Sequence, residues 1–89
     1  MIVYFSSPLR SYTGGQSKLN IKSGDYASVN ELLKELDRRY PGMRIGIINE
    51  QNEIRSHIKL FINYSPAESL KSLLYFSDEI HIITVLTDE

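Results

Sequence analysis

The stretch SVNELLKELDRRYPG, residues 28–42, decides the fold class of this 89-residue chain. Ser28 with Glu31 three residues later forms a capping box, which typically begins a helix. The apolar residues that follow recur at spacings of three and four, as on one face of a helix: Val29, Leu32, Leu33, Leu36 and Tyr40. Pro41-Gly42 ends the pattern. The charged residues between them are expected in water, so this amphipathic helix should cover a sheet.

Two strands are predicted before this helix. Residues 2–5 (IVYF) are β-formers, and residues 18–22 alternate polar with apolar side chains. Gly14-Gly15 lies between them and indicates a turn, so the two strands are expected to pair as a hairpin. A phosphate-binding loop is the less favoured interpretation of Gly14-Gly15, because no Gly-Lys-Ser/Thr sequence and no helix follow it.

Two more strands are predicted after the helix. Residues 57–63 alternate between two faces, with Ile58, Leu60 and Ile62 on one and Lys59 and Phe61 on the other. Residues 80–85 form the last strong strand. The segments between these strands have weaker patterns.

Three segments carry these weaker patterns. Residues 45–48 are interpreted as a short extended piece, and residues 49–52 as a polar turn. Residues 69–75 are interpreted as a connection that includes at most one helical turn.

The predicted order is therefore strand, strand, helix, strand, strand. Burying the apolar face of a single helix favours a mixed sheet in which the first and last strands are adjacent. A right-handed crossover through the helix makes these two strands parallel. The sequence thus predicts the α+β class: one β-grasp (ubiquitin-like) domain over residues 1–89, with four to five strands on one main helix.

Composition excludes several classes of function. With 10 basic and 11 acidic residues the net charge is −1, and the basic residues are scattered, so nucleic acid is not an expected partner. The absence of cysteine removes disulfides, thiolate metal sites and a cysteine nucleophile. The apolar run at the start is too short for a signal peptide, and no stretch is long enough for a membrane span. We expect a cytoplasmic protein with no membrane contact.

Motifs along essentially the whole chain carry a family resemblance. They are FSSPLRSYTGG (residues 5–15), ASVNELLKELDRRYPGM (27–43), HIKLFIN (57–63) and SDEI (77–80). In this order and spacing the chain resembles the MoaD/ThiS family of ubiquitin-like sulfur carriers. The resemblance implies a β-grasp fold and activity at the C-terminal tail, whose carboxylate becomes an acyl-adenylate and then a thiocarboxylate.

The tail departs from the family's pattern. The expected tail residues are Thr87, Asp88 and Glu89, and Asp88 and Glu89 occupy the positions of the family's terminal Gly-Gly. Two glycines let a tail thread a narrow channel, whereas two acidic side chains add bulk and negative charge beside a triphosphate. We therefore expect this chain not to carry sulfur.

The sheet face away from the helix is the candidate partner-binding site. Strand alternation puts Tyr4, Phe61, His81, Ile83 and Val85 there, as an exposed apolar patch. The resemblance implies docking on this face, although Ser6 stands where an apolar contact is expected and indicates a different or weaker partner. The alternative interpretation is ordinary apolar surface, or surface that loops partly cover.

Other candidate sites have weaker support. His57 and His81 lie on different strands without a carboxylate pattern, so they are interpreted as polar strand residues and not as zinc ligands. Arg38-Arg39 is explained by the helix dipole and solvation better than by an anion site. No catalytic residues and no cofactor are expected, so the chain is not interpreted as an enzyme.

Two functions remain open. The favoured one is a non-catalytic protein-binding module that docks another protein through the sheet face and the C-terminal strand, with a MoaE-like or adenylating-enzyme-like subunit as the candidate partner. The alternative is a sulfur carrier with an atypical C-terminus, of the molybdopterin-synthase small-subunit or thiamine type. Self-association as a homodimer through the last strand also stays open.

Overall fold

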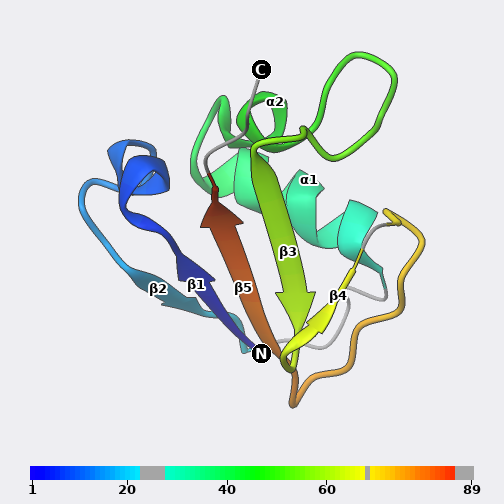
Figure 1. Cartoon of the computed structure of the whole chain (residues 1–89). Helices are drawn as coiled ribbons and strands as arrows, with labels where there is room; N and C mark the ends of the chain where they lie inside the picture. Colours follow the sequence, from blue (N-terminus) through cyan, green and yellow to red (C-terminus); the bar gives the residue numbers. More distant parts are fainter. Residues whose placement is uncertain (23–27, 68, 86–89) are drawn as a thin grey trace.

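One mixed sheet lies across one side of the molecule, and the helices lie behind it (Figure 1). The structure is a computed structural model that describes residues 1–22, 28–67 and 69–85. In these residues the sheet has five strands in the order β2-β1-β5-β3-β4. The strands are β1 (Ile2–Phe5), β2 (Lys18–Asn20), β3 (Ile58–Ile62), β4 (Ser65–Pro66) and β5 (Glu79–Thr84), and the helices are η1 (Ser7–Ser11), α1 (Val29–Arg39) and α2 (Met43–Ile47).

The strand pairing confirms the predicted topology. β1 and β2 form an antiparallel hairpin, and Gly14 and Gly15 in its loop have φ angles of 68° and 94°, as the turn interpretation requires. β1 lies parallel to β5, with Val3 opposite Ile80. β3 lies antiparallel to β5, with Leu60 opposite Ile82. The first and last strands are therefore adjacent in the centre of the sheet.

Helix α1 begins and packs as its sequence predicts. The Ser28 side chain accepts a hydrogen bond from the Glu31 backbone N–H at 3.4 Å, and the helix begins at Val29. Its apolar face is completely buried, with 0% exposure at Val29, Leu32, Leu33 and Leu36. Tyr40 ends the helix and meets the Phe5 ring edge-on at 6.0 Å. This packing fixes which face of the sheet is inside.

The interpretation of residues 45–48 as extended is wrong for residues 45–47, because α2 occupies Met43–Ile47, whereas Ile48 is extended and forms a β-bridge with Ile54. The Asp37 carboxylate accepts the backbone N–H groups of Gly42 and Arg44, at 3.1 and 3.3 Å, and so satisfies donors at the start of α2. Met43 and Ile47, one helical turn apart, are both buried. The local β-branched composition favours a strand, but the capping carboxylate comes from the preceding helix.

Other segments differ from their prediction in smaller ways. Residues 7–11, between the first two predicted strands, form the short helix η1, which buries Leu9. Residues 69–75 contain a turn closed by Ser72 N–H to Ser69 O at 3.2 Å, and they are not helical. Residues 49–52 form the predicted turn, with the Asn49 side chain accepting two backbone N–H groups.

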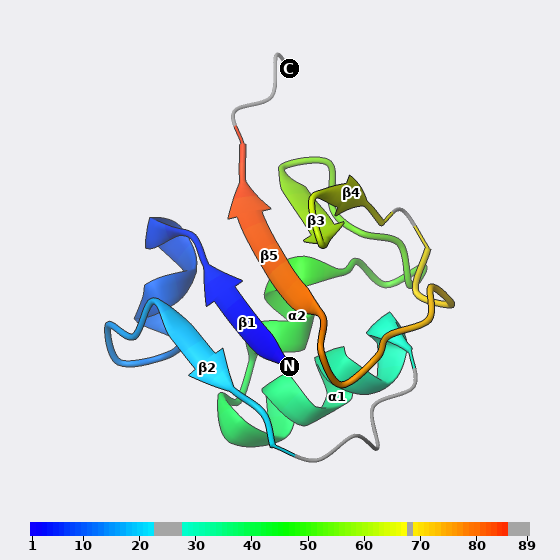
Figure 2. The same cartoon turned by 90° about the horizontal axis from the view of Figure 1, so that it is seen from below.

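The hydrophobic core lies between the sheet and both helices, which cover the same face (Figure 2). The side chains of the sheet that face this core are 0–2% exposed: Val3, Phe5, Ile58, Leu60, Ile80 and Ile82. None of the described helices is long and apolar enough to cross a membrane. No helix of the described part of the chain lies over the opposite face of the sheet (Figure 1).

Candidate functional site

A row of rings crosses the three central strands on the face away from the helices. Tyr4 of β1 is directly opposite His81 of β5, and His81 is directly opposite Phe61 of β3. The Tyr4 and His81 rings stack with centroids 4.6 Å apart and an angle of 8° between their planes. Ile83, two residues further along β5, is on the same face. Strand register therefore brings together the side chains that alternation predicted there.

The degree of exposure predicted for this face needs correction. Ile83 is exposed at 36%, but Tyr4, Phe61, His81 and Val85 are half-buried. Stacking is one cause, because each ring of the Tyr4–His81 pair covers part of the other. The face is thus an ordered row of rings and not a loose apolar patch.

Tyr64 belongs to this face, although strand alternation did not place it there. It lies in the turn between β3 and β4 and is 79% exposed. Its ring stacks on that of His81, with the two centroids 5.8 Å apart. Asn63 and Tyr64 have φ angles of 49° and 73°. Asn tolerates this left-handed conformation, but a bulky residue rarely adopts it. The sequence signal that could have placed Tyr64 here is the two-residue turn Asn63-Tyr64, recognisable as a tight hairpin connection.

We call Tyr4, Phe61, Tyr64, His81 and Ile83 the outer aromatic face. Its central residue, His81, has a buried Nε2 without a hydrogen-bond partner among the described residues. The nearest carboxylate oxygen is Glu79 Oε2 at 3.9 Å, which becomes an ion pair only when the imidazole is protonated. His57 is exposed, and the described residues contain no group of three or more His, Cys, Asp or Glu arranged to hold a metal ion.

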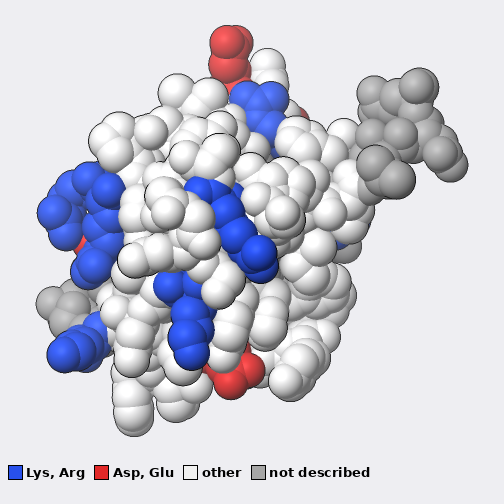
Figure 3. Space-filling model, turned by 90° about the vertical axis from the view of Figure 1, so that its left-hand side faces the viewer, with Lys and Arg blue, Asp and Glu red and all other residues white. Residues whose placement is uncertain are grey.

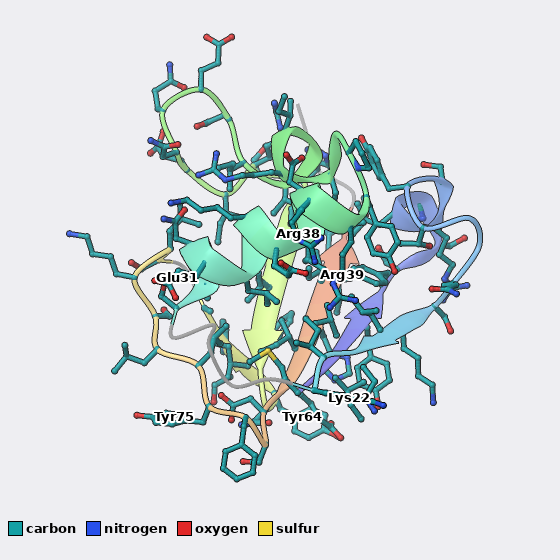
Figure 4. The ribbon with its side chains drawn as sticks, turned by 180° about the vertical axis from the view of Figure 1, so that it is seen from behind. Lys22, Glu31, Arg38, Arg39, Tyr64 and Tyr75 are labelled. Atoms are coloured by element: carbon teal, nitrogen blue, oxygen red, sulfur yellow. The ribbon has the colours of Figure 1, made fainter. Side chains whose placement is uncertain are left out.

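A hydrogen-bonded clasp holds the Tyr64 turn against the start of β5. Asp78 is 6% exposed, and its carboxylate accepts the Asn63 side-chain amide and the Tyr75 backbone N–H, both at 2.8 Å. The Asn63 side-chain oxygen in turn accepts the Glu79 N–H at 2.9 Å. Two motifs of the family resemblance, the Asn that ends 57–63 and the Asp of 77–80, are therefore direct partners. Tyr64 and Tyr75 lie at this same end of the molecule (Figure 4).

Ser6 anchors the opposite end of β5. Its hydroxyl oxygen accepts the Thr84 backbone N–H at 3.0 Å and lies 3.1 Å from the Thr84 hydroxyl. A serine in this position thus has a structural role where an apolar partner contact was expected. The predicted tail residues, Thr87, Asp88 and Glu89, lie outside the described residues.

A small cleft of about 430 Å³ adjoins this end of β5. Pro8, Tyr12, Ile45, His57 and Thr84 are among its lining residues. Ile45 is 70% exposed and Tyr12 is 38% exposed, so apolar surface continues beyond the sheet. The cleft offers a second contact area for a protein that binds around the end of β5.

Arg38 and Arg39 lie near the end of α1 (Figure 4) and both pair with Glu35. The nitrogen–oxygen distances are 2.5 and 2.6 Å, and the Glu35 side chain is only 10% exposed. Hydrogen bonds from Arg38 and then Arg39 lower the pKa of Glu35 from its ordinary 4.5 to about 2. The pair of arginines therefore has an internal carboxylate partner, which sequence reasoning missed. Elsewhere on this side, Lys and Arg are dispersed among uncharged atoms (Figure 3).

Solved structures with a similar fold are known. A chain of the Amycolatopsis orientalis BexX/CysO complex matches with a TM-score of 0.84 and 19% identity, over 99% of this chain and 98% of that one. Small archaeal modifier protein 1 from Methanosarcina acetivorans matches with a TM-score of 0.77 and 25% identity, over 99% and 94%. A Pyrococcus furiosus protein proposed to be molybdopterin converting factor subunit 1 matches with a TM-score of 0.71 and 15% identity, over 96% and 95%.

These likenesses extend over essentially the whole chain and confirm the ubiquitin-like β-grasp fold that the sequence resemblance implied. No protein-family model matches the chain, and comparison with curated proteins also gives no match. The likeness is therefore one of fold, and the outer aromatic face is the feature from which a function can be argued.

Proposed function

We propose that this chain is a ubiquitin-like binding module that docks a partner protein through the outer aromatic face, with the end of β5 contributing to the same interface. The observation that carries the proposal is the row Tyr4–His81–Tyr64, in which an imidazole lies between two tyrosine rings. Rigid aromatic side chains lose little conformational freedom on binding, and interface hot spots are enriched in tyrosine.

The backbone at Tyr64 also supports a binding role. A left-handed conformation at a residue other than glycine costs on the order of 1–2 kcal/mol, so a two-residue turn that carries Tyr where Gly would be unstrained is not optimised for stability. In this backbone conformation the exposed Tyr64 ring stacks on His81. Strained backbone of this kind is common at functional sites.

The direct test uses one substitution on the face and a matched control away from it. Ile83→Asp puts a charge in the middle of the proposed interface, and Leu73→Asp makes the same kind of change at a residue that is 64% exposed in the segment between β4 and β5. The measurement is affinity for the adenylating-enzyme-like or MoaE-like subunit from the same organism, by calorimetry. Ile83→Asp is expected to weaken binding about 30-fold or more, as a hot-spot loss, and Leu73→Asp by less than about twofold.

The opposite pattern contradicts the proposal. Equal affinities for the two variants, with unfolding curves that match the wild type, mean that the outer aromatic face is not the interface. If neither candidate subunit binds the wild-type chain at micromolar concentration, the identity proposed for the partner is wrong.

A sulfur carrier is the second candidate function. The observation in its favour is the fold shared with the CysO chain and with the proposed molybdopterin converting factor subunit. Incubation of the full chain with ATP, a sulfide source and the adenylating enzyme, followed by intact-mass spectrometry, tests it. Replacement of one C-terminal carboxylate oxygen by sulfur supports the carrier, whereas an unchanged mass beside a modified positive-control carrier supports the binding module.

A further inference from the structure

Strand β3 has one open edge. β5 pairs along its full length on one side, but β4 pairs only with Phe61 and Ile62 on the other. The last bond on that side runs from Ala67 N–H to Leu60 O at 2.8 Å. The antiparallel register directs the Leu60 N–H and the Ile58 carbonyl to the same side, where neither has a partner among the described residues. The Ile58 N–H is bonded to Arg55 O at 2.9 Å, so the open part of this edge in the described residues consists of those two groups, which another extended chain can bind.

A groove runs along the open edge, with a volume of about 1210 Å³. The described residues that bound it lie in three segments: residues 52–56, the beginning of α1, and residues 66, 67 and 69–71. In Figure 1 the loop between α2 and β3 and the segment after β4 lie on the same side of β3. The groove is separate from the outer aromatic face, although Phe61 contributes to both.

The groove is basic. Its described lining includes five cationic residues and one acidic residue, Glu53; the cationic ones are Lys34, Arg44, Arg55, Lys59 and Lys71. None of the five is in an ion pair within the described residues, whereas Arg38 and Arg39 at the end of α1 share Glu35. Within the described residues, the positive charge along this edge therefore has no ion-pair partner.

Arg44 shows this most clearly. One guanidinium nitrogen, Nη2, donates to the Asn30 side-chain oxygen at 3.1 Å, and this bond holds the Arg44 side chain in place. Its Nε is buried without a hydrogen-bond partner among the described residues. A buried cationic donor without an acceptor is unfavourable, so a nearby negative charge would be stabilising.

Apolar side chains alternate with these charges. Ile58 and Leu60 are buried at the edge of β3, and Ile54 and Leu70 are half-buried in the adjoining walls. A strand that entered here would place alternate side chains towards apolar atoms and towards lysine ammonium groups. The site therefore suits an extended peptide better than a small inorganic anion, which would use only the charges.

We propose that this groove binds an extended acidic segment of a partner protein, which adds as a strand to the open edge of β3. Its main chain bonds to Leu60 N–H and Ile58 O, its apolar residues contact Ile54 and Leu70, and its carboxylates pair with Lys34 and Lys71. The contact is a second interaction surface beyond docking at the outer aromatic face and does not depend on it.

The probe is a short synthetic peptide of alternating Glu and Val, labelled with fluorescein and titrated with the full chain. Fluorescence anisotropy gives the affinity, and amide NMR of the chain gives the location. The Leu60 amide is expected to shift and to exchange more slowly with solvent, while the amides of β2 stay unchanged. Binding should weaken as salt is raised, because the lysines at the rim are exposed.

A matched pair of double variants tests the charges. Lys34→Glu with Lys71→Glu reverses two exposed lysines of the groove, and Lys18→Glu with Lys22→Glu reverses two exposed lysines at the β2 edge. Net charge changes equally in both. The groove variant is expected to bind the peptide about tenfold or more weakly, and the β2 variant within about twofold of wild type. Circular dichroism checks that both are folded.

Four outcomes overturn the proposal. They are equal weakening by the two double variants, equal binding of a Lys-Val peptide, shifts confined to the outer aromatic face, and no Glu-Val binding at millimolar concentration. Inorganic phosphate that shifts the Lys34 and Arg44 amides while the Glu-Val peptide does not identifies the groove as a small-anion site instead.

Discussion

The two faces of the central sheet are built from neighbouring residues of the same strands but differ in what covers them. On the inner face, Leu60 and Ile82 lie under the helices and are 2% and 0% exposed. On the outer face, Tyr4 stacks on His81, and Tyr64 stacks on His81 as well. The inner face therefore contributes most of the stability of the fold. The outer face has ordered side chains that are not part of the core.

The largest expected effect separates the two faces directly. Ile82→Ala removes buried volume in the centre of the core and should lower the free energy of unfolding by about 3 kcal/mol. Ile83→Ala, the next residue of β5 but on the outer face, should lower it by less than about 1 kcal/mol. Urea denaturation measures both. Equal losses would show that the outer face is as important for stability as the inner one.

The clasp at the end of β5 should give the next largest effect. Asp78→Ala leaves the Tyr75 N–H and the Asn63 side-chain amide without their buried acceptor. The expected loss is about 2 kcal/mol in the free energy of unfolding. Ser77→Ala, at the exposed neighbouring residue, is the control and should change it little. NMR should show the Tyr64 turn and the Tyr75 amide losing protection together; protection unchanged at Tyr64 would contradict a clasp.

Substitutions of Tyr64 sharpen the comparison, because they should affect partner binding more than the free energy of unfolding. Tyr64→Gly relieves the positive φ but loses the stack on His81, so stability should change by less than about 0.5 kcal/mol. Tyr64→Val cannot relieve the backbone and should cost about 1 kcal/mol or more. Both variants should weaken binding to the same partner subunit that is used to test Ile83→Asp. A Gly variant that binds normally would remove Tyr64 from the interface.

The smallest effect concerns the solvent side of α1. Glu35→Gln should lower the free energy of unfolding at neutral pH by about 0.5 kcal/mol, since Arg38 is largely exposed. Folding lowers the pKa of Glu35 from 4.5 to about 2, so its stabilisation is complete above pH 4.5 and is lost as the pH falls through about 2. Denaturation of both proteins across this range should converge at the acid end. A difference that stays constant with pH would contradict the pairing.

The sequence predicted the elements whose pattern is local. Strand alternation identified the inner-face residues, and the capping box with the apolar spacing of residues 28–42 identified α1, because burial on one face leaves a period in the sequence. The same reasoning failed at residues 45–47, where β-branched residues favour a strand. There the Asp37 carboxylate and the burial of Met43 and Ile47 decide for a helix. Those contacts depend on how α1 is placed.

The sequence by itself determined the β-grasp order and the composition of each sheet face, because both follow from side-chain periodicity. Only the tertiary structure decided that His81 stacks with both Tyr4 and Tyr64, and that two backbone groups on the β3 edge, Leu60 N–H and Ile58 O, have no partner among the described residues. These features join positions far apart in the chain. They depend on strand register and turn geometry, which are set by many weak contacts between distant residues and leave no local pattern in a single sequence.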